Sequence, residues 1–413
     1  MSDATKEEIA SFLREKQAAE TAFLAELVKV PSDNPPGDCA PHAKRAAELL
    51  EALGFKVERH PVPDDVARAN GMISATNLVV RECFGDGPVI ACNAHGDVVP
   101  PGLGWSVDPY GAQIKDGYMY GRGVAVSKSD FATYAFALLA LKASGAKLNG
   151  TVELHLTYDE EAGGLIGPGR LLEQKISQPD YAISAGFSYG VTTAHNGCLH
   201  LEVEVIGKSA HAAMPSTGVD ALEAATTGVL SDIYAIRKTY ANKKSKVAGI
   251  DSPTLTVGLI AGGINTNVVP DNVTLRLDRR IIPEENPAEV EAALTKQIKE
   301  SAAKWPGISC NVRRILLAVP FVPMPGQEKL VEAITRHATN ILGEEVKSQG
   351  SPLYTDARLY SAAGIPTVLY GAGPHTLLEA NGHRADEKLK LDDLYKATLV
   401  IALAIHDLLG EQA

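Results

Sequence analysis

Two pairs of chemically active side chains each follow an apolar run that is typical of a buried strand. His95 and Asp97 come directly after the run 89–92, and Glu160 and Glu161 close a second run whose hydrophobicity alternates. Ligands of open α/β sheets bind at the carboxyl ends of the strands. An imidazole at such a position can bind a metal ion, and a nearby carboxylate can orient the imidazole. Each pair alone also fits a solvated loop or an acidic helix start, but two such pairs favour a site.

Two further polar segments lie near the C-terminus. Residues 355–358 have the sequence Thr-Asp-Ala-Arg and precede a strand-like apolar run, and residues 381–387 form a polar loop that contains His383. Each segment taken singly fits an ordinary surface loop. Together with the first two pairs, and in this order along the chain, they form a recognisable set of motifs.

The elements that must hold these residues alternate between strands and helices. A helix is predicted over 126–143 and a strand over 150–158. Later helices are expected over 327–342 and 391–409. This alternation predicts the α/β class, with a largely parallel central sheet flanked by helices.

The middle of the chain has a different pattern. From residue 197 the order of elements is β-α-β-β-α-β, which is the split βαβ pattern of a small α+β domain. We therefore expect residues 1–196 and 317–413 to form one catalytic domain and residues 197–316 to form an inserted lid and dimerisation domain.

Length and composition indicate the number of domains, the binding partners that can be excluded and the redox setting. The chain has 413 residues, which is more than the roughly 100–200 of one ordinary core, so two domains are expected. Its net charge of −11 argues against nucleic acid and acidic membrane surfaces as partners, and no apolar run approaches the ~18 residues of a membrane span. Five scattered cysteines favour a reduced, cytoplasmic setting.

The order of motifs along the chain resembles that of a known family. The motifs are His-x-Asp at 95–97, Gly-Arg-Gly at 121–123, Asp-Glu-Glu at 159–161, Gly-x-x-x-His at 207–211, Asn-x-x-Pro-Asp at 267–271, Thr-Asp-Ala-Arg at 355–358 and a final His383. This set resembles the co-catalytic zinc hydrolases of the aminoacylase, acetylornithine deacetylase, succinyl-diaminopimelate desuccinylase and carboxypeptidase G family. The resemblance implies hydrolysis of an amide or related C–N bond in a small carboxylate-bearing substrate, such as an N-acyl amino acid or a dipeptide.

The resemblance implies roles for five residues of the catalytic domain. His95 corresponds to a metal ligand, Asp97 to the acid that orients the general base, and Glu160 to that base. Glu161 and His383 correspond to the ligands of a second ion. In such a site a metal lowers the pKa of bound water and the base takes its proton.

Three further residues take roles from the same resemblance. His211 corresponds to a histidine that enters the active site of a partner subunit and stabilises the oxyanion. Asn267 corresponds to a substrate contact, and Arg358 to a guanidinium that binds the substrate carboxylate. A homodimer is therefore implied, with the lid strand near His211 or the adjacent helix at the interface. The alternative is a lone histidine that packs locally.

Two of the family's five metal ligands are absent. Val126 stands where the bridging aspartate belongs, and residues 183–189 lack the acid that binds the first ion. Two dications about 3.5 Å apart repel by roughly 19 kcal/mol at an effective dielectric constant of about 20, and the bridging carboxylate normally offsets much of this. We therefore expect one divalent ion held by His95, Glu161 and His383, a set that suits zinc, manganese or iron equally.

Three alternatives stay open at this level. Asp130, one helical turn after Val126, could supply an acid for a second ion, although we expect it on the exposed side of its helix. A metal-free site could work by acid–base chemistry of Glu160 and Asp97 with the two histidines. A non-catalytic protein that binds a small ligand is the third alternative.

Overall fold

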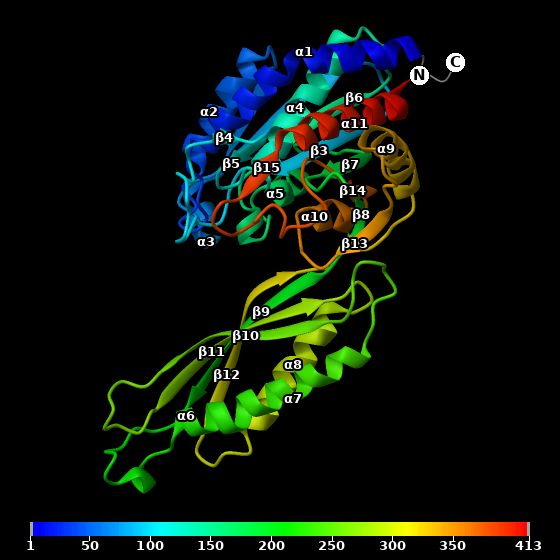
Figure 1. Ribbon diagram of the computed structural model, residues 1–413. Coiled ribbons are helices and arrows are strands. Elements are labelled where there is room, and N and C mark those ends of the chain that lie inside the picture. Colours follow the sequence, from blue (N-terminus) through cyan, green and yellow to red (C-terminus); the bar gives the residue numbers. More distant parts are fainter. Residues whose placement is uncertain (1–2, 411–413) are drawn as a thin grey trace. The chain divides into compact units, whose positions relative to one another are not determined.

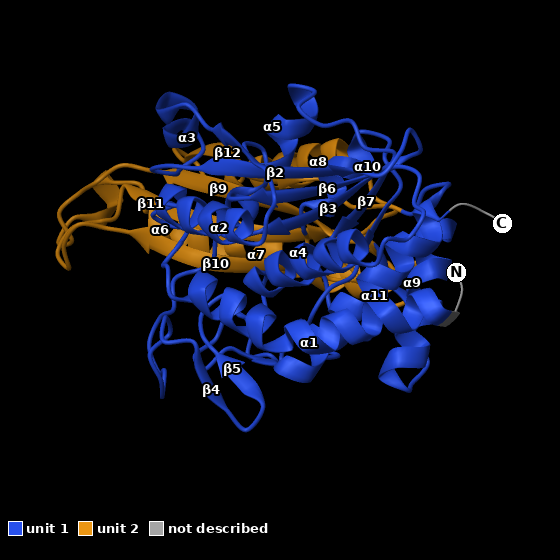
Figure 2. Cartoon of the chain, turned by 90° about the horizontal axis from the view of Figure 1, so that it is seen from above, with its two compact units in different colours: residues 1–193, 323–349, 355–413 blue, residues 194–322, 350–354 orange. Residues whose placement is uncertain are grey.

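The structure is a computed structural model that describes residues 3–410 (Figure 1). The chain divides into two compact units (Figure 2). Unit 1 contains residues 1–193, 323–349 and 355–413, and unit 2 contains residues 194–322 and 350–354. Unit 2 thus interrupts unit 1 in the sequence, and each unit has an apolar core of its own.

An eight-stranded sheet forms the centre of unit 1. Its order β1-β2-β6-β3-β7-β14-β8-β13 comprises Val57–Pro61, Thr76–Cys83, Thr151–Thr157, Val89–His95, Tyr181–Ser184, Thr367–Leu369, Val191–His195 and Ser348–Ser351. Strands β6, β3, β7 and β14 are parallel to one another, whereas β1, β2 and β8 pair antiparallel with their neighbours. The α/β class is confirmed, and the parallel strands form the centre of the sheet.

Helices cover both faces of this sheet. Figure 2 shows α1, α4 and α11, which contact one another, on one side of the strands, and α5 and α10 on the other. The helices of unit 1 are α1 (Asp3–Val28), α2 (Ala40–Ala52), α3 (Asp64–Ala69), α4 (Lys128–Ala143), α5 (Pro168–Glu173), α9 (Gln327–Leu342), α10 (Ala357–Ala362) and α11 (Leu391–Leu409). A small sheet is formed by β4 (Gln113–Lys115), β5 (Tyr118–Tyr120) and β15 (Lys388–Lys390).

Unit 2 is an antiparallel four-stranded sheet with helices. The strands β9 (Gly197–Ile206), β10 (Thr254–Gly262), β11 (Asn272–Ile281) and β12 (Ser309–Ala318) lie in the order β10-β11-β9-β12. The helical segments are α6 (Ala221–Glu223), η3 (Ala224–Leu230), α7 (Ser231–Thr239) and α8 (Pro287–Ala302). Alternate residues of β9 belong to the apolar core, beginning with Leu199 and Leu201, while the residues between them are polar.

The order of strands in unit 2 limits which of them can offer a free edge to a second subunit. The strand nearest His211 in the sequence is β9, which ends at Ile206 and pairs with both β11 and β12. A central strand has no free edge to offer to a second subunit. The edges of this sheet are β10 and β12, so an interface formed edge to edge has to use one of these.

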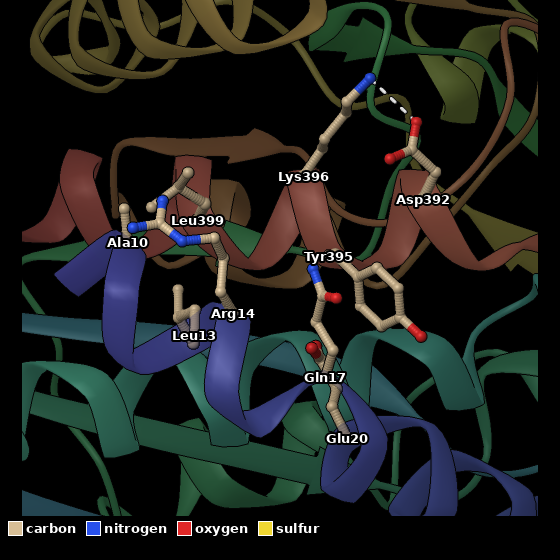
Figure 3. A pocket seen from close by; sticks show the side chains of 9 residues that line it. All are labelled: Ala10, Leu13, Arg14, Gln17, Glu20, Asp392, Tyr395, Lys396 and Leu399. Atoms are coloured by element: carbon tan, nitrogen blue, oxygen red, sulfur yellow. Dashed lines mark ion pairs between the residues drawn. The ribbon is translucent and has the colours of Figure 1, made fainter. Parts of the chain in front are cut away.

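A cavity of about 110 Å³ lies between α1 and α11 (Figure 3). It is lined by Ala10, Leu13, Arg14, Gln17, Glu20, Asp392, Tyr395, Lys396 and Leu399. The ion pair of Lys396 with Asp392 measures 2.9 Å. Glu20 is buried and accepts a hydrogen bond from the Thr398 hydroxyl, and burial raises the pKa of its carboxyl to about 8.

This buried carboxyl makes the stability of the fold depend on pH. The pKa of Glu20 in the fold exceeds its ordinary value of 4.5, so its favourable contribution is present below that ordinary value and is lost as the pH rises through about 8. We predict that Glu20→Gln stabilises the protein at pH 9 by roughly 2–4 kcal/mol and has little effect at pH 4. Urea unfolding at both pH values measures this, with exposed Glu173→Gln as control. An equal effect of Glu20→Gln at both pH values would contradict it.

Candidate active site

The two polar pairs meet because their strands are parallel neighbours. His95 is the last residue of β3 and lies beside Thr157, the last residue of β6. The Gly96 amide donates to the Thr157 carbonyl at 2.9 Å, and a Cβ at Gly96 would stand 2.4 Å from the Tyr158 ring. The glycine is therefore required for the two chain segments to approach so closely.

The His95 ring is held by one nitrogen and presents the other to the acids. Its Nδ1 lies 2.9 Å from the Asp97 carbonyl oxygen and 3.5 Å from the Asp97 carboxylate. Its Nε2 is 4.0 Å from Glu160 Oε2. One ligand atom each of His95, Glu160 and Glu161 lies within 4.8 Å of the others.

Asp97 holds the turn that carries both glutamates. Its carboxylate accepts from the backbone amides of Glu160 at 3.3 Å and Glu161 at 3.1 Å, and from Asn34 Nδ2 at 3.0 Å. Burial disfavours the charge of this carboxylate, but its interactions with His95 and Asn34 outweigh burial and lower the pKa of Asp97. Asn34, in the loop after α1, was not identified from the sequence.

The site holds more acid than base. Burial raises the pKa of Glu160 to about 8, and Glu161 and Asp97 add to the rise while His95 opposes it. Burial also disfavours a charge on His95, yet the surrounding acids raise its pKa well above the ordinary value. A buried cluster of this kind is stabilised by protons or by a bound cation.

His383 reaches the cluster through Glu161. Its Nε2 is 3.3 Å from Glu161 Oε1, and its side chain is 45% exposed. The Glu161 carboxylate accepts a hydrogen bond from the protonated His383 ring, which raises the pKa of His383. Among the described residues, the ligand atoms that lie together are those of His95, Glu160 and Glu161, and His383 lies outside this group and contacts only Glu161 of its members.

Other groups occupy the two positions where the family has metal-binding acids. The Val126 side chain packs against the apolar core, and its amide donates to Glu387 Oε1 at 3.2 Å. In the loop after β7, the Ser188 hydroxyl donates to the Gly371 carbonyl at 2.9 Å. These neutral groups do not fit a bridged pair of dications.

The expected exposure of Asp130 is wrong. Asp130 is 1% exposed, because helix α4 is covered by the sheet and by helices α1 and α11. Its carboxylate accepts from the Ala372 amide at 2.8 Å, and burial raises its pKa well above the ordinary value. Asp130 is not one of the acids whose ligand atoms lie together at His95.

Arg358 is buried at the start of α10. Its Nη2 donates to the carbonyl of Gly163, which follows the turn of the two glutamates. Nearby Asp356 is also buried, and its Oδ2 has no hydrogen-bond partner among the described residues. Burial, followed by the charge of Glu160, raises the pKa of Asp356 well above its ordinary value. The segment 355–358 was noted from the sequence, but a role was predicted only for Arg358, so the place of Asp356 beside Glu160 is known from the structure alone.

His211 and Asn267 come together in unit 2. The Ala212 amide donates to the Asn267 carbonyl at 3.0 Å, and His211 bridges to Val268. Both residues are exposed. The Ala213 amide donates to His211 Nδ1 at 3.1 Å, which leaves Nε2 as the ring nitrogen for any further contact.

The donor set at His95 fits a divalent cation. A neutral imidazole whose Nδ1 bonds to a carbonyl oxygen presents Nε2 as a ligand, which is the usual orientation of a metal-binding histidine. The two carboxylates beside it supply oxygen ligands, and their mutual repulsion is relieved by positive charge. The observation that supports this fit is that one ligand atom each of His95, Glu160 and Glu161 lies within 4.8 Å of the others.

The α/β fold and the donor set at His95 together are those of a metal-dependent hydrolase. A family model described as Peptidase family M20/M25/M40 matches residues 91–407, and the chain belongs to this family. The resemblance inferred from the motifs is confirmed. The protein is therefore an enzyme that hydrolyses C–N bonds. Within residues 3–410, no helix combines the length and the apolar character needed to cross a membrane.

Individual relatives support the same assignment. Acetylornithine deacetylase of Proteus mirabilis is 30% identical over 331 residues, which cover 79% of this chain and 80% of that protein. Aminopeptidase PepT of Bacillus cereus superposes with a TM-score of 0.71 at 25% identity, covering 94% of this chain and 98% of that chain. A dinuclear metal-binding M20 peptidase of Bacillus subtilis shares the fold, with a TM-score of 0.66 at 17% identity over 96% and 99% of the chains.

Proposed function

We propose that this protein hydrolyses an amide bond in a small carboxylate-bearing molecule, with Glu160 as the general base. One observation carries the proposal: the Asp97 carboxylate holds the amides of Glu160 and Glu161, while its carbonyl turns His95 Nε2 toward them. N-acyl amino acids and dipeptides are the first substrates to test, since relatives include an acetylornithine deacetylase and an aminopeptidase.

We propose a single divalent ion at this site, held by His95, Glu161 and His383, with Glu160 close to it. Zinc, manganese and iron all suit these ligands. A bound ion of this kind lowers the pKa of water and polarises a carbonyl group. One ion rather than two follows from the neutral groups at Val126 and in the loop 183–189.

Proton transfer, positioning of the base and substrate binding are proposed for different residues of the chain. Glu160 accepts a proton from the attacking water on a carboxylate oxygen and returns it to the leaving nitrogen. The cation proposed beside it would oppose the rise that burial causes in the pKa of Glu160 and so favour the carboxylate that accepts the proton. The Asp97 carboxylate positions Glu160 by accepting a hydrogen bond from the Glu160 backbone amide. Arg358 is proposed to bind the substrate carboxylate, and Asn267 to contact the substrate.

We also propose a cytoplasmic homodimer in which His211 stabilises the oxyanion in the partner's site. The edge strand β10 exposes Leu259 and Ile260, by 59% and 53%, and Ile264 just beyond it by 77%. An apolar edge of this kind is suited to a symmetric interface. No disulfide joins the cysteines of the described chain, which is in keeping with a reducing compartment.

Metal content tests the ligand set. We predict that His95→Ala and His383→Ala each lose one metal equivalent relative to the wild type, because ligands of one ion fail together, and that chelation abolishes turnover. Elemental analysis of protein purified without added metal measures this, with His60→Ala as the control. Full activity without metal would favour the acid–base alternative, in which protonated His95 is the electrophile.

The role of Glu160 is tested by an isosteric change. We predict that Glu160→Gln lowers kcat on N-acyl amino acids and dipeptides by about 10²–10⁴-fold, since the amide cannot accept the proton. Metal content has to stay at the wild-type level for this interpretation. A loss below about tenfold would remove Glu160 from the role of base.

Arg358 has two possible tasks, and the substrate separates them. If it binds the carboxylate, Arg358→Ala raises KM for a carboxylate substrate by about 10–100-fold and leaves the matching primary-amide analogue almost unaffected, since only the carboxylate loses its partner. If it only supports the Gly163 turn, both substrates lose activity equally. Steady-state kinetics with the substrate pair decides between these outcomes.

Mixing two inactive variants tests the dimer. Glu160→Gln lacks its own base but retains His211, whereas His211→Ala retains its base, so a mixed dimer has one intact site. We predict that each variant alone is inactive and that an equimolar mixture, after subunit exchange, regains about a quarter of wild-type activity. Sedimentation gives the oligomeric state. A fully active monomer, or a mixture without recovery, would contradict the proposal.

A further inference from the structure

A second group of metal-binding side chains lies on the sheet of unit 2. His200 of β9 stands directly opposite Asp278 of β11, and Cys198 stands opposite Arg280. Because side chains alternate along a strand, Cys198 and His200 share one face of the sheet. That face is opposite to the one on which Leu199 and Leu201 join the apolar core.

The three donor atoms form a compact triangle. Cys198 Sγ lies 3.1 Å from His200 Nε2, His200 Nε2 lies 3.1 Å from Asp278 Oδ2, and Cys198 Sγ lies 3.8 Å from Asp278 Oδ2. Ligands of a tetrahedral zinc ion stand about 3.3–3.6 Å apart, given Zn–S near 2.3 Å and Zn–N and Zn–O near 2.0–2.2 Å. Shifts of a few tenths of an ångström would make the triangle one face of such a tetrahedron.

The geometry differs from that of a nucleophilic cysteine. In a catalytic cysteine–histidine–acid arrangement, the sulfur and the carboxylate contact opposite nitrogens of the imidazole. Here both the sulfur and the carboxylate contact the same nitrogen, His200 Nε2. Three donors that converge on one point are the pattern of a metal site rather than of a proton relay.

Arg280 supplies the outer support that such a site needs. Its Nε donates to Asp278 Oδ1 at 2.9 Å and its Nη2 to Asp278 Oδ2 at 3.1 Å. A carboxylate oxygen has two lone pairs, so Oδ2 can accept from Arg280 and still bind a cation. Once Cys198 loses its proton on binding, the thiolate and the carboxylate against one guanidinium carry a net negative charge that the cation neutralises.

We propose that Cys198, His200 and Asp278 form a binding site for a thiophilic divalent transition metal, with zinc as the expected ion. Cys198 is buried at the floor, while the side chains of His200 and Asp278 are 34% and 31% exposed and leave a path for the ion. Binding releases the thiol proton to solvent. A fourth position remains for water or an external ligand. The site uses no residue of unit 1, so it does not depend on the proposed hydrolase function.

Cobalt(II) is the probe, because a cobalt–thiolate bond gives an intense near-ultraviolet charge-transfer band. The proposed site of unit 1 has only nitrogen and oxygen ligands and cannot give this band. We expect chelator-treated full-length protein to develop the band as cobalt is added beyond two equivalents, enough to fill the proposed site of unit 1 as well, and to lose it on addition of excess zinc. Absence of the band would overturn the proposal.

Variants assign the band to the three ligands. Cys198→Ser should abolish it, His200→Ala and Asp278→Asn should weaken cobalt binding by more than about tenfold, and Cys310→Ser and His383→Ala should leave it unchanged. Circular dichroism checks folding, and if Cys198→Ser does not fold, partly exposed His200→Ala gives the decision. A band that persists in these ligand variants would overturn the proposal, whatever the enzyme's activity.

Discussion

The active site depends on one buried carboxylate. Asp97 follows β3, and its oxygens accept from the amides of Glu160 and Glu161, which follow β6, and from Asn34, which follows α1. Three segments far apart in the sequence thus meet at one side chain. Since an unsatisfied buried amide costs about 1–3 kcal/mol, loss of this carboxylate would release the turn that aims both glutamates. The same residue fixes the His95 ring through its carbonyl.

The acids around this anchor are distributed differently from those of a bridged dinuclear centre. Where a bridging acid would stand, the amides of Ala125 and Val126 donate to Glu387, and Arg122 forms an ion pair of 2.5 Å with the same carboxylate. The charge of Glu387 is thereby used to hold the loop before α4. Negative charge available to a cation is concentrated on Glu160 and Glu161, which is why a single ion accounts for the site better than a pair.

Local patterns predicted most elements, because apolar periodicity reports which face of an element is buried. Helices α9 and α11 have the bounds that the sequence indicates. The error concerns neighbours that periodicity does not reveal. Asp130 was placed on an exposed face, but α4 is covered on all sides. Periodicity also does not show that β9 is a central strand of its sheet, which leaves the helix adjacent to His211 or an edge strand for the proposed interface.

The same limit applied to the site. His95, Asp97, Glu160 and Glu161 were found because each pair is adjacent in sequence and follows a strand that belongs to the parallel centre of the sheet. Asn34 lies alone in a loop, and only the fold brings it to Asp97. Asp356 belongs to the noted segment 355–358, but the sequence assigned it no role, and only the fold shows that it lies near Glu160. Likewise, no spacing rule links Cys198 and His200 to Asp278, since the pairing of β9 with β11 joins residues about 80 positions apart.

If the proposed ion and a carboxylate substrate both bind at this site, their binding is coupled by charge. Glu160, Glu161 and Asp97 lie together, so a carboxylate substrate that approaches them meets repulsion unless positive charge is present. Arg358 is one source, but its Nη2 is already directed to the Gly163 carbonyl. A divalent ion at His95 would offset the repulsion at the point where it is strongest. In this arrangement, the ion contributes to the affinity for an anionic substrate as well as to the activation of water, and the two effects cannot be removed separately.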